Sequence, residues 1–397
     1  MGASIDNVKK QNILIVHNYY QIPGGEDTVV ANEKQMLEEY GHKVILYSRS
    51  NSELKQMPKW QKLSLLFSTV FNLRTYRDIK QLIRMEHIDI VHVHNTLNLI
   101  SPSVYYAARA MKIPVVQTIH NFRLLCPGAT FYRDGHICED CVTKGLKCAV
   151  KHGCYRGSKL QTLACVISAT IHRMTGIYGK INYICLTEFN KAKLLQLKQI
   201  NADRVFVKPN FVKVTVDEII PYKKRKNQFV YVGRLDKLKG VDILFKAWKL
   251  MGEAAPTLLI CGIGPMEKWC ERYIHNNNLS SIKMMGFVPN NSVKKLIANS
   301  KALILPTQWY EGFPMTIVEA FSVATPVIGS NLGNVGSIID DEINGWRFDY
   351  KSIDALYKTV MKSHDITKQI IQDRKKYESS TNYRKLIYIY DNCARWR

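Results

Sequence analysis

Long hydrophobic runs are absent from this chain of 397 residues. Its most apolar stretch, residues 160–171, is interrupted by amide and hydroxyl side chains and falls short of the ~18 consecutive apolar residues that a membrane-spanning helix needs. The N-terminus has no apolar segment of a secretory signal, and Asp6 stands where a myristoylation motif requires Ser or Thr. We therefore expect a cytoplasmic protein without a membrane-spanning helix.

Acidic residues are few relative to basic ones. There are 33 Asp and Glu against 56 Lys and Arg, which gives a formal net charge of +23. The hydrophobic share of 46% excludes a disordered chain, which lacks the apolar residues for a core. A cationic surface favours nucleic acid, anionic lipid or polyphosphate-bearing ligands, and charge alone leaves these three open.

Ten cysteines in a reducing compartment do not indicate a disulfide framework. Six of them fall in a segment, residues 126–165, that we call the Cys-rich insertion. The spacing of Cys126, Cys138, Cys141 and Cys154 is compatible with a structural zinc ion. Reduced loop thiols are the alternative. A catalytic thiol is not expected, because nothing near these residues supplies a base.

Two series of short apolar runs alternate with helical patterns, and they meet near residues 208–214. The runs of the first series are residues 12–18, 42–49, 89–95, 113–121 and 181–187. Those of the second are residues 228–234, 256–262, 281–287, 301–307 and 325–330. This alternation predicts two α/β domains with parallel sheets, residues 1–208 and 209–379. Residues 380–397 have helical spacing and are expected to pack back on the first domain. A site is expected in a cleft between the carboxyl ends of the two sheets.

The most informative segment runs from Glu311 to residue 330. Glu311 follows the apolar run 301–307, so it should lie at that strand's carboxyl end. Pro314 suits a first helical turn, and the amide groups from Phe313 to Thr316 would then form an anion site. Glu319 lies eight positions beyond Glu311, about two turns into the predicted helix. The alternative is an acid that favours the helix dipole and a surface glutamate.

This segment resembles the signature of retaining glycosyltransferases of family 4, which have the two-domain GT-B fold. Further segments that resemble the family in the same order are residues 17–27, 118–122, 232–248, 261–269, 285–293 and 324–330. The resemblance covers nearly the whole chain. It implies a sugar transferred from a nucleoside diphosphate, with Arg234 and Lys239 neutralising the diphosphate as negative charge develops there. A salt bridge at a domain edge is the alternative for Arg234.

The resemblance assigns the remaining site residues as well. Glu319 would hydrogen-bond the ribose, Glu311 would contact the donor sugar and favour positive charge at its anomeric carbon, and His120 would hydrogen-bond near the sugar and acceptor. Further donor contacts fall to Gly24, Gly25, Gly233, Gly312, Phe313, Pro314, Met315 and Thr316. The Cys-rich insertion follows His120 and could shape the acceptor side.

No catalytic metal is implied, since Arg, Lys and helix amides replace the divalent ion. Asp340 and Asp341 are adjacent and do not have the spacing of a metal-binding aspartate pair. One departure concerns residues 331–341, where the family usually has a glutamate that this chain lacks. That difference leaves the donor sugar contacts there open.

Residues 55–84 form a basic stretch with apolar residues at helical spacing. The apolar positions are Leu63, Leu66, Phe67, Val70 and Phe71. This composition is typical of a helix that lies in an anionic membrane interface. A helix that packs on the domain's own sheet is the alternative.

Together these patterns predict a retaining glycosyltransferase of the hexosyltransferase type. We expect a nucleoside-diphosphate sugar donor, UDP-sugar first, and a glycan or lipid-linked acceptor used in cell-surface polysaccharide synthesis. The protein would be cytoplasmic, peripheral on the inner face of the cell membrane, and would not bind nucleic acid. Two alternatives remain: a sugar-nucleotide epimerase with the same fold, and a basic nucleic-acid-binding protein, which would need a recognisable module.

Overall fold

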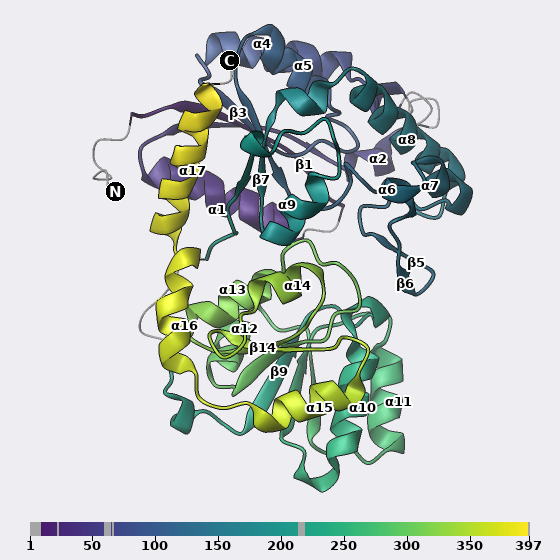
Figure 1. The fold of residues 1–397 in the computed structure, drawn as a ribbon, viewed down its shortest axis with the longest axis vertical. Coiled ribbons are helices and arrows are strands. Elements are labelled where there is room, and N and C mark those ends of the chain that lie inside the picture. The colour runs from purple at the N-terminus through teal and green to yellow at the C-terminus, as the bar shows by residue number, and fades with distance from the viewer. Residues whose placement is uncertain (1–8, 22–23, 59–64, 66, 213–218, 396–397) are drawn as a thin grey trace. The chain divides into compact units, whose positions relative to one another are not determined.

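The computed structural model describes residues 9–21, 24–58, 65, 67–212 and 219–395 (Figure 1). The chain divides into two compact units. Unit 1 comprises Met1–Pro209 with Ser380–Arg397, and unit 2 comprises Asn210–Ser379. Each unit contains one six-stranded sheet in which all pairings are parallel. The predicted class, two α/β domains with parallel sheets, is confirmed.

Unit 1 has the strand order β2-β1-β3-β4-β7-β8. Its strands are β1 (Asn12–Tyr19), β2 (Lys43–Ser50), β3 (Ile90–Asn95), β4 (Val115–Ile119), β7 (Asn182–Cys185) and β8 (Val205–Val207). Its main helices are α1 (Gly25–Glu39), α2 (Glu53–Gln56), α4 (Leu73–Met85), α5 (Ser103–Ala110), α8 (Lys159–Met174), α9 (Glu188–Leu194) and α17 (Ser379–Ala394). The strand order reverses direction between β1 and β3, which is where open α/β sheets bind ligands at their carboxyl ends.

The Cys-rich insertion separates β4 from β7. It contains a small hairpin and two short helices before α8: β5 (Tyr132–Arg133), β6 (His136–Ile137), α6 (Asp140–Thr143) and α7 (Lys147–His152). Among the described residues of unit 1 are also the 3-10 helices η2 (Ile177–Lys180) and η3 (Ala202–Arg204).

The C-terminal helix α17 packs on unit 1. Its buried face includes Tyr383, Leu386 and Tyr390, residues whose helical spacing is visible in the sequence. The Tyr383 hydroxyl lies 2.9 Å from His42 Nε2, and the Tyr390 hydroxyl lies 2.8 Å from His92 Nδ1. Side chains of α17 thereby complete the interior of a unit formed mainly by the N-terminal half of the chain.

Unit 2 has the strand order β11-β10-β9-β12-β13-β14. Its strands are β9 (Gln228–Val232), β10 (Thr257–Cys261), β11 (Ile282–Gly286), β12 (Ala302–Leu305), β13 (Val327–Ser330) and β14 (Gly345–Phe348). Its α-helices are α10 (Val241–Met251), α11 (Glu267–Asn276), α12 (Asn290–Ala298), α13 (Met315–Ser322), α14 (Gly333–Ile338), α15 (Ile353–Lys362) and α16 (Thr367–Asp373). Its 3-10 helices are η5 (Tyr222–Lys224), η6 (Lys237–Lys239), η7 (Gly252–Ala254) and η8 (Arg374–Tyr377).

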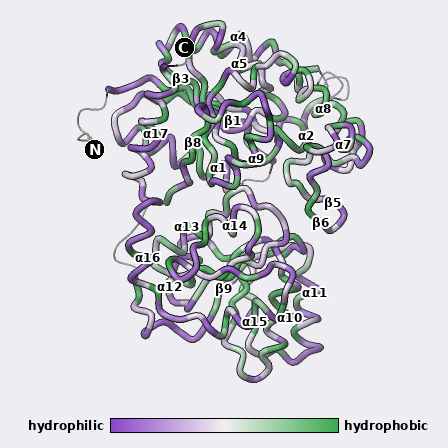
Figure 2. The backbone as a smooth tube through the Cα atoms, in the orientation of Figure 1, coloured by the Kyte–Doolittle hydropathy of each residue, from purple (hydrophilic) through white to green (hydrophobic). Residues whose placement is uncertain are grey.

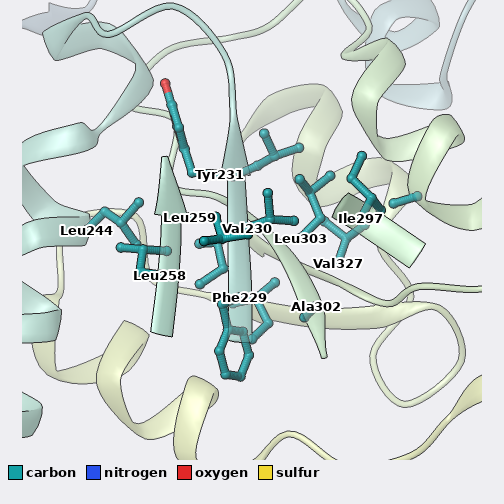
Figure 3. Close-up of a cluster of buried hydrophobic side chains, with 14 of the residues drawn as sticks. Phe229, Val230, Tyr231, Leu244, Leu258, Leu259, Ile297, Ala302, Leu303 and Val327 are labelled. Carbon is teal, nitrogen blue, oxygen red and sulfur yellow. The ribbon is translucent and has the colours of Figure 1, made fainter. Parts of the chain in front are cut away.

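The core of unit 2 forms around the central strand β9, whose apolar run is buried by helices on both faces of the sheet. Figure 3 shows Phe229 and Val230 of β9 beside Leu258 of β10 and Leu303 of β12. The hydropathy colouring in Figure 2 follows the same rule, with hydrophobic residues gathered on the strands. A parallel sheet covered on both faces requires such continuous apolar strands.

The predicted basic helix over residues 55–84 is not continuous. Residues 59–64 and 66, which include Leu63 and Leu66, lie outside the described residues. The chain is non-helical at Phe71 and Asn72. The Asn72 side chain then starts α4 by accepting a hydrogen bond from the Thr75 amide. Helix α4 buries its own apolar face, so its packing agrees with the alternative of a helix that covers its own domain.

Candidate functional site

The best-defined polar cluster of unit 2 surrounds Glu311, which follows β12. Its carboxylate accepts hydrogen bonds from Lys239 Nζ at 2.7 and 2.9 Å. Thr307 Oγ1 and Trp309 Nε1 each donate to Glu311 Oε1 at 2.9 Å. Glu311 is 8% exposed, so its carboxylate is buried among hydrogen-bond donors that satisfy its oxygens. The structure thus brings together two of the residues that the sequence assigned to the donor.

Lys239 reaches Glu311 because the chain makes a tight turn after η6. Gly240 has φ 72°, and a Cβ there would lie 1.7 Å from the carbonyl oxygen of Pro306. Only glycine permits both the left-handed backbone and this close approach. Asp236 caps η6 by accepting a hydrogen bond from the Leu238 amide at 2.9 Å.

Asn334 of α14 holds the backbone after Glu311 in place. Its side-chain amide donates to the carbonyl oxygens of Glu311 at 2.6 Å and Gly312 at 2.5 Å. Sequence reasoning missed this residue, which lies in the segment where the family's glutamate is absent. Its position shortly after β13 could have indicated it, because the carboxyl ends of β12 and β13 place Asn334 and Glu311 at the same edge of the sheet.

Helix α13 begins at Met315, with Pro314 as its N-cap residue. The first hydrogen bond within the helix runs from the Ile317 amide to the Pro314 carbonyl, which leaves the Met315 and Thr316 amides available for an anion. Because the helix starts at Met315, Glu319 lies about one turn into it; the prediction of two turns was wrong. Burial raises the pKa of Glu319.

Arg234 follows β9 and stays largely in solvent. Its side chain is 67% exposed, and its Nε lies 3.7 Å from Asp236 Oδ2. The Tyr231 hydroxyl donates to the Arg234 carbonyl at 2.8 Å and fixes the backbone. The preceding Gly233 is tightly packed: a Cβ on Gly262 would lie 1.9 Å from the Gly233 carbonyl oxygen. The guanidinium of Arg234 is therefore accessible to a ligand.

In unit 1 the predicted glycines lie at the start of α1, next to the strand-order reversal. Gly24 is the N-cap residue, and a side chain there would meet nothing within 4 Å. The Gly24 amide donates to Asp27 Oδ2 at 3.0 Å, while Asp27 Oδ1 lies 2.7 Å from His17 Nε2. Burial raises the pKa of the adjacent Glu26 to about 8, so this carboxyl is largely protonated at neutral pH. Sequence reasoning did not single out Glu26.

His120 ends β4 and contacts a buried polar chain. Its Nε2 lies 2.9 Å from His94 Nδ1 of β3. His94 Nε2 lies 3.4 Å from Glu33 Oε1 of α1, and Glu33 Oε2 pairs with Lys208 Nζ at 3.0 Å. Burial lowers the pKa of His94 to about 3 and, with the neighbouring imidazoles, holds the pKa of His120 well below its usual value. Both imidazoles are neutral, which suits His120 to hydrogen bonding.

Glu33, His92 and His94 lie close enough to resemble a metal-binding group. The Lys208 ammonium 3.0 Å from Glu33 opposes a cation there. Both His92 nitrogens also have partners, the Tyr390 hydroxyl and Thr118 Oγ1, each at 2.8 Å. Although burial alone would raise it, Lys208 and His92 hold the pKa of Glu33 well below its ordinary value. We therefore assign a buried hydrogen-bond network rather than a metal centre.

A pocket of about 70 Å³ within unit 1 opens beside His120. The lining residues come from the ends of β3 and β4, residues 121–127 that lead into the Cys-rich insertion, and helices α5 and α8, together with Thr69 and Tyr178. They include Asn95, His120, Arg123, Cys165 and Ser168. The insertion therefore helps to line a pocket at the His120 edge of the sheet.

The four cysteines of the predicted zinc set gather in the insertion as free thiols. Burial raises the pKa of Cys141 to about 12, and the thiols of Cys126, Cys154 and Cys138 add to this shift. Within the part of the chain that the structure describes, no three of these sulfur atoms lie within 4.8 Å of one another. The zinc ion stays a prediction.

No helix of the described residues is long and apolar enough to cross a membrane.

Comparison with known proteins connects both units to sugar transfer. Residues 215–383 match the family model described as Glycosyl transferases group 1, and residues 23–136 match that described as Glycosyltransferase Family 4. The Klebsiella pneumoniae "Uncharacterized 41.2 kDa protein in cps region" is 22% identical over 365 residues, 91% of this chain and 88% of that protein. An Escherichia coli UDP-Gal:alpha-D-GlcNAc-diphosphoundecaprenol alpha-1,3-galactosyltransferase is 23% identical over 316 residues, 75% of this chain and 72% of that enzyme.

Two solved structures share the fold over nearly the whole chain. A glycosyltransferase from Rickettsia africae ESF-5 has a TM-score of 0.66 at 17% identity and covers 97% of this chain and 98% of its own. Anabaena HepE in complex with UDP has a TM-score of 0.64 at 14% identity and covers 94% and 98%. Both family models describe glycosyltransferases, so the epimerase and nucleic-acid-binding alternatives receive no support. With one model on each unit, the protein belongs to the glycosyltransferases of group 1 and family 4, with the GT-B fold.

Proposed function

We propose that this glycosyltransferase is a retaining hexosyltransferase. It takes its sugar from a UDP-sugar and transfers it to a lipid-linked or other glycan acceptor in cell-surface polysaccharide synthesis. The observation that carries the proposal is the buried Glu311 carboxylate held against Lys239 at 2.7 Å, next to the N-terminus of α13. The UDP bound by Anabaena HepE and the lipid-linked acceptor named for the E. coli relative support the choice of donor and acceptor.

Each proposed donor contact follows from the chemistry of the residue. Lys239 and the exposed Arg234 balance the diphosphate, with help from the Met315 and Thr316 amides. Glu319 accepts hydrogen bonds from the ribose. These preorganised cations and amides stabilise the leaving diphosphate more than the intact UDP-sugar, because negative charge develops on the diphosphate as the sugar departs.

The proposed reaction is front-face substitution. The bond from the anomeric carbon to the diphosphate oxygen breaks, and the acceptor hydroxyl oxygen bonds to that carbon from the same side. The hydroxyl proton passes to a diphosphate oxygen. Glu311 stabilises the positive charge at the anomeric carbon, and neutral His120 hydrogen-bonds the sugar or acceptor. No metal is required, because cationic side chains and helix amides occupy its role.

The proposed place of action is the cytoplasmic face of the cell membrane. The net charge of +23 supports this, since that leaflet carries anionic lipid.

A thermal-shift panel with UDP, GDP and ADP tests the donor assignment. A ligand at 100 times its dissociation constant stabilises its protein by about 2.7 kcal/mol. We expect UDP to stabilise the wild type but not Arg234→Ala or Glu319→Ala. Arg272→Ala and Glu271→Ala are the matched controls, since both residues are exposed on α11. Loss of the UDP shift in the controls, or no shift in the wild type, would contradict the assignment.

The stereochemical proposal needs its own measurement. Proton NMR of the product formed from an α-linked UDP-sugar should show an α-anomeric signal. A β-anomeric product would rule out retention while leaving the donor site intact.

A further inference from the structure

Helix α8 exposes its apolar side chains along its whole length. Leu160, Leu163, Ile167, Ile171 and Met174 are between 40% and 82% exposed. Their spacing of three and four residues places them on one face of the helix. Five large apolar side chains in one stripe exceed what scattered surface residues produce.

The opposite face of α8 is buried and unusually polar. Ser168 Oγ donates to the Thr69 carbonyl at 3.4 Å, and His172 Nε2 lies 2.9 Å from the Val70 carbonyl oxygen. Thr162 is fully buried as well. These contacts fix the rotation of α8, so the helix turns hydroxyl and imidazole groups inward and aliphatic groups outward. This reverses the normal arrangement of a surface helix.

The chain around this stripe is predominantly basic, and Asp140, which directly precedes residues 141–187 in sequence, pairs with Lys144 at 2.9 Å. Residues 141–187 contain no Asp or Glu. They contain seven basic residues: Lys144, Lys147, Lys151, Arg156, Lys159, Arg173 and Lys180. A groove between α7 and α8 is lined by Lys147 and Lys151 on its α7 side and by Leu163 and Met174 on its α8 side. Apolar and cationic groups therefore alternate across one surface, the α7–α8 surface.

The charge distinguishes among the partners that could cover this surface. In a symmetric dimer the same patch meets itself, and the excess cations on the two copies, such as Lys147 and Lys151, which form no ion pair among the described residues, would repel each other. An anionic bilayer satisfies both features, because its headgroups attract the lysines while its acyl region accepts the aliphatic stripe.

We propose that the α7–α8 surface docks this protein on an anionic lipid bilayer, with the stripe of α8 inserted at the interface and Lys147 and Lys151 among the headgroups. Cys165 and Ser168, on the inner side of the same helix, line the pocket beside His120. A lipid-linked acceptor held at the bilayer would therefore lie one helix diameter from that pocket. Only this last link rests on the proposed function, because vesicle binding is measured without donor or acceptor.

Vesicle co-sedimentation tests the stripe. We expect the wild type to pellet with vesicles of phosphatidylcholine and phosphatidylglycerol in a three-to-one ratio, to bind pure phosphatidylcholine far less, and to lose binding as salt rises. Ile167→Ser with Ile171→Ser should weaken anionic-vesicle binding at least tenfold. Leu250→Ser with Ile263→Ser, residues of unit 2 that are more exposed than the tested pair, should leave binding unchanged. Equal binding by both pairs would overturn the proposal.

The basic rim has a parallel test. Lys147→Glu with Lys151→Glu should weaken binding at least tenfold, whereas Lys249→Glu with Lys268→Glu, exposed residues of unit 2, should not. If the two pairs weaken binding equally, overall charge rather than this surface is responsible. Transferase activity without vesicle binding would refute this surface and leave the proposed function intact.

A third experiment uses single tryptophan substitutions at exposed positions, so it applies even if the double variants fail to fold. Met174→Trp should gain fluorescence quenching by brominated lipid in anionic vesicles, whereas Leu250→Trp should not. Equal quenching of both, or quenching of neither, would overturn the proposal. A stripe variant that turns a dimer into a monomer without changing vesicle binding would also overturn it and assign the surface to a second copy.

Discussion

The buried ion pair between Lys208 and Glu33 makes a sharp prediction about stability. Both side chains are 1% exposed, and Lys208 Nζ also donates to Asn382 Oδ1 of α17 at 2.9 Å. Lys208→Met would leave the Glu33 carboxylate buried without its cation. Removal of one partner from a buried pair costs about 3–5 kcal/mol. We expect unit 1, rather than unit 2, to carry this loss.

The expected size of the effect follows from the size of the unit. Domains of about 150–250 residues lose roughly 2–4 °C in melting temperature per kcal/mol. Lys208→Met should therefore lower the unit 1 transition by roughly 6–20 °C in scanning calorimetry. Because Asn382 Oδ1 also loses the hydrogen bond from Lys208, limited proteolysis should cut the C-terminal segment sooner.

Two variants control this experiment. Lys198→Met removes an exposed lysine of the same unit and should change the melting temperature little. Lys208→Met combined with Glu33→Gln removes both charges and should recover part of the loss, since no buried charge remains. The reasoning is refuted if Lys208→Met melts with the Lys198→Met control, or if the double variant is less stable than the single one.

Three further predictions concern pH, a glycine and the central carboxylate. Burial lowers the pKa of His94 to about 3, so between pH 6.5 and 3 the unfolded chain binds a proton that the fold excludes. This histidine therefore costs about 1.4 kcal/mol of stability per pH unit as pH falls below ~6.5. Glu26, whose pKa burial raises to about 8, has the opposite effect on the pH dependence of stability. The contribution of His94 is therefore isolated by comparing the unfolding free energy of the wild type and His94→Phe, measured with urea at several pH values. The same change of unfolding free energy with pH in both proteins would contradict the prediction. Gly240→Ala should weaken UDP binding at least tenfold in calorimetric titration, whereas Gly252→Ala, also at positive φ but with nothing within 4 Å of its Cβ, should not. Glu311→Gln should lower kcat roughly 10²–10³-fold and leave UDP binding unchanged or tighter, because the neighbouring lysine is released; weaker UDP binding would contradict its assigned role.

The sequence predicts the long, buried strands well and the short ones poorly. All ten apolar runs contain a strand of the structure, because a sheet covered on both faces requires continuous apolar segments. Strands β8 and β14 were missed. Strand β8 has only three residues, and β14 has an exposed arginine among its four. The approach of β14 to its neighbour shows why it forms. Strand β14 exists because Gly345 lets it approach β13, where a Cβ would lie 2.0 Å from the Val327 carbonyl oxygen. Such a strand is defined by its partner rather than by its own composition.

The site shows the same division between local and distant information. Glu311 and Lys239 are visible in the sequence because they lie in motifs with fixed spacing. Glu33 and Lys208 are 175 positions apart, and the sequence around Glu33 predicts only an acidic residue on a helix. The sequence around His94 predicts only a strand. Only the three-dimensional contact reveals that these groups support His120.

In the proposed donor site, the contact between Lys239 and Glu311 would let one carboxylate serve both the empty and the loaded state. Without donor, Lys239 compensates the buried charge of Glu311. If Lys239 turns to a donor phosphate, Thr307 and Trp309 still donate to Glu311 Oε1, and these two bonds keep the carboxylate oriented. Glu311 Oε2 would then lose its only hydrogen bond among the described residues and could accept one from a sugar hydroxyl. Donor binding would therefore exchange partners around a fixed carboxylate, and this needs less reorganisation than bringing an acid in from solvent.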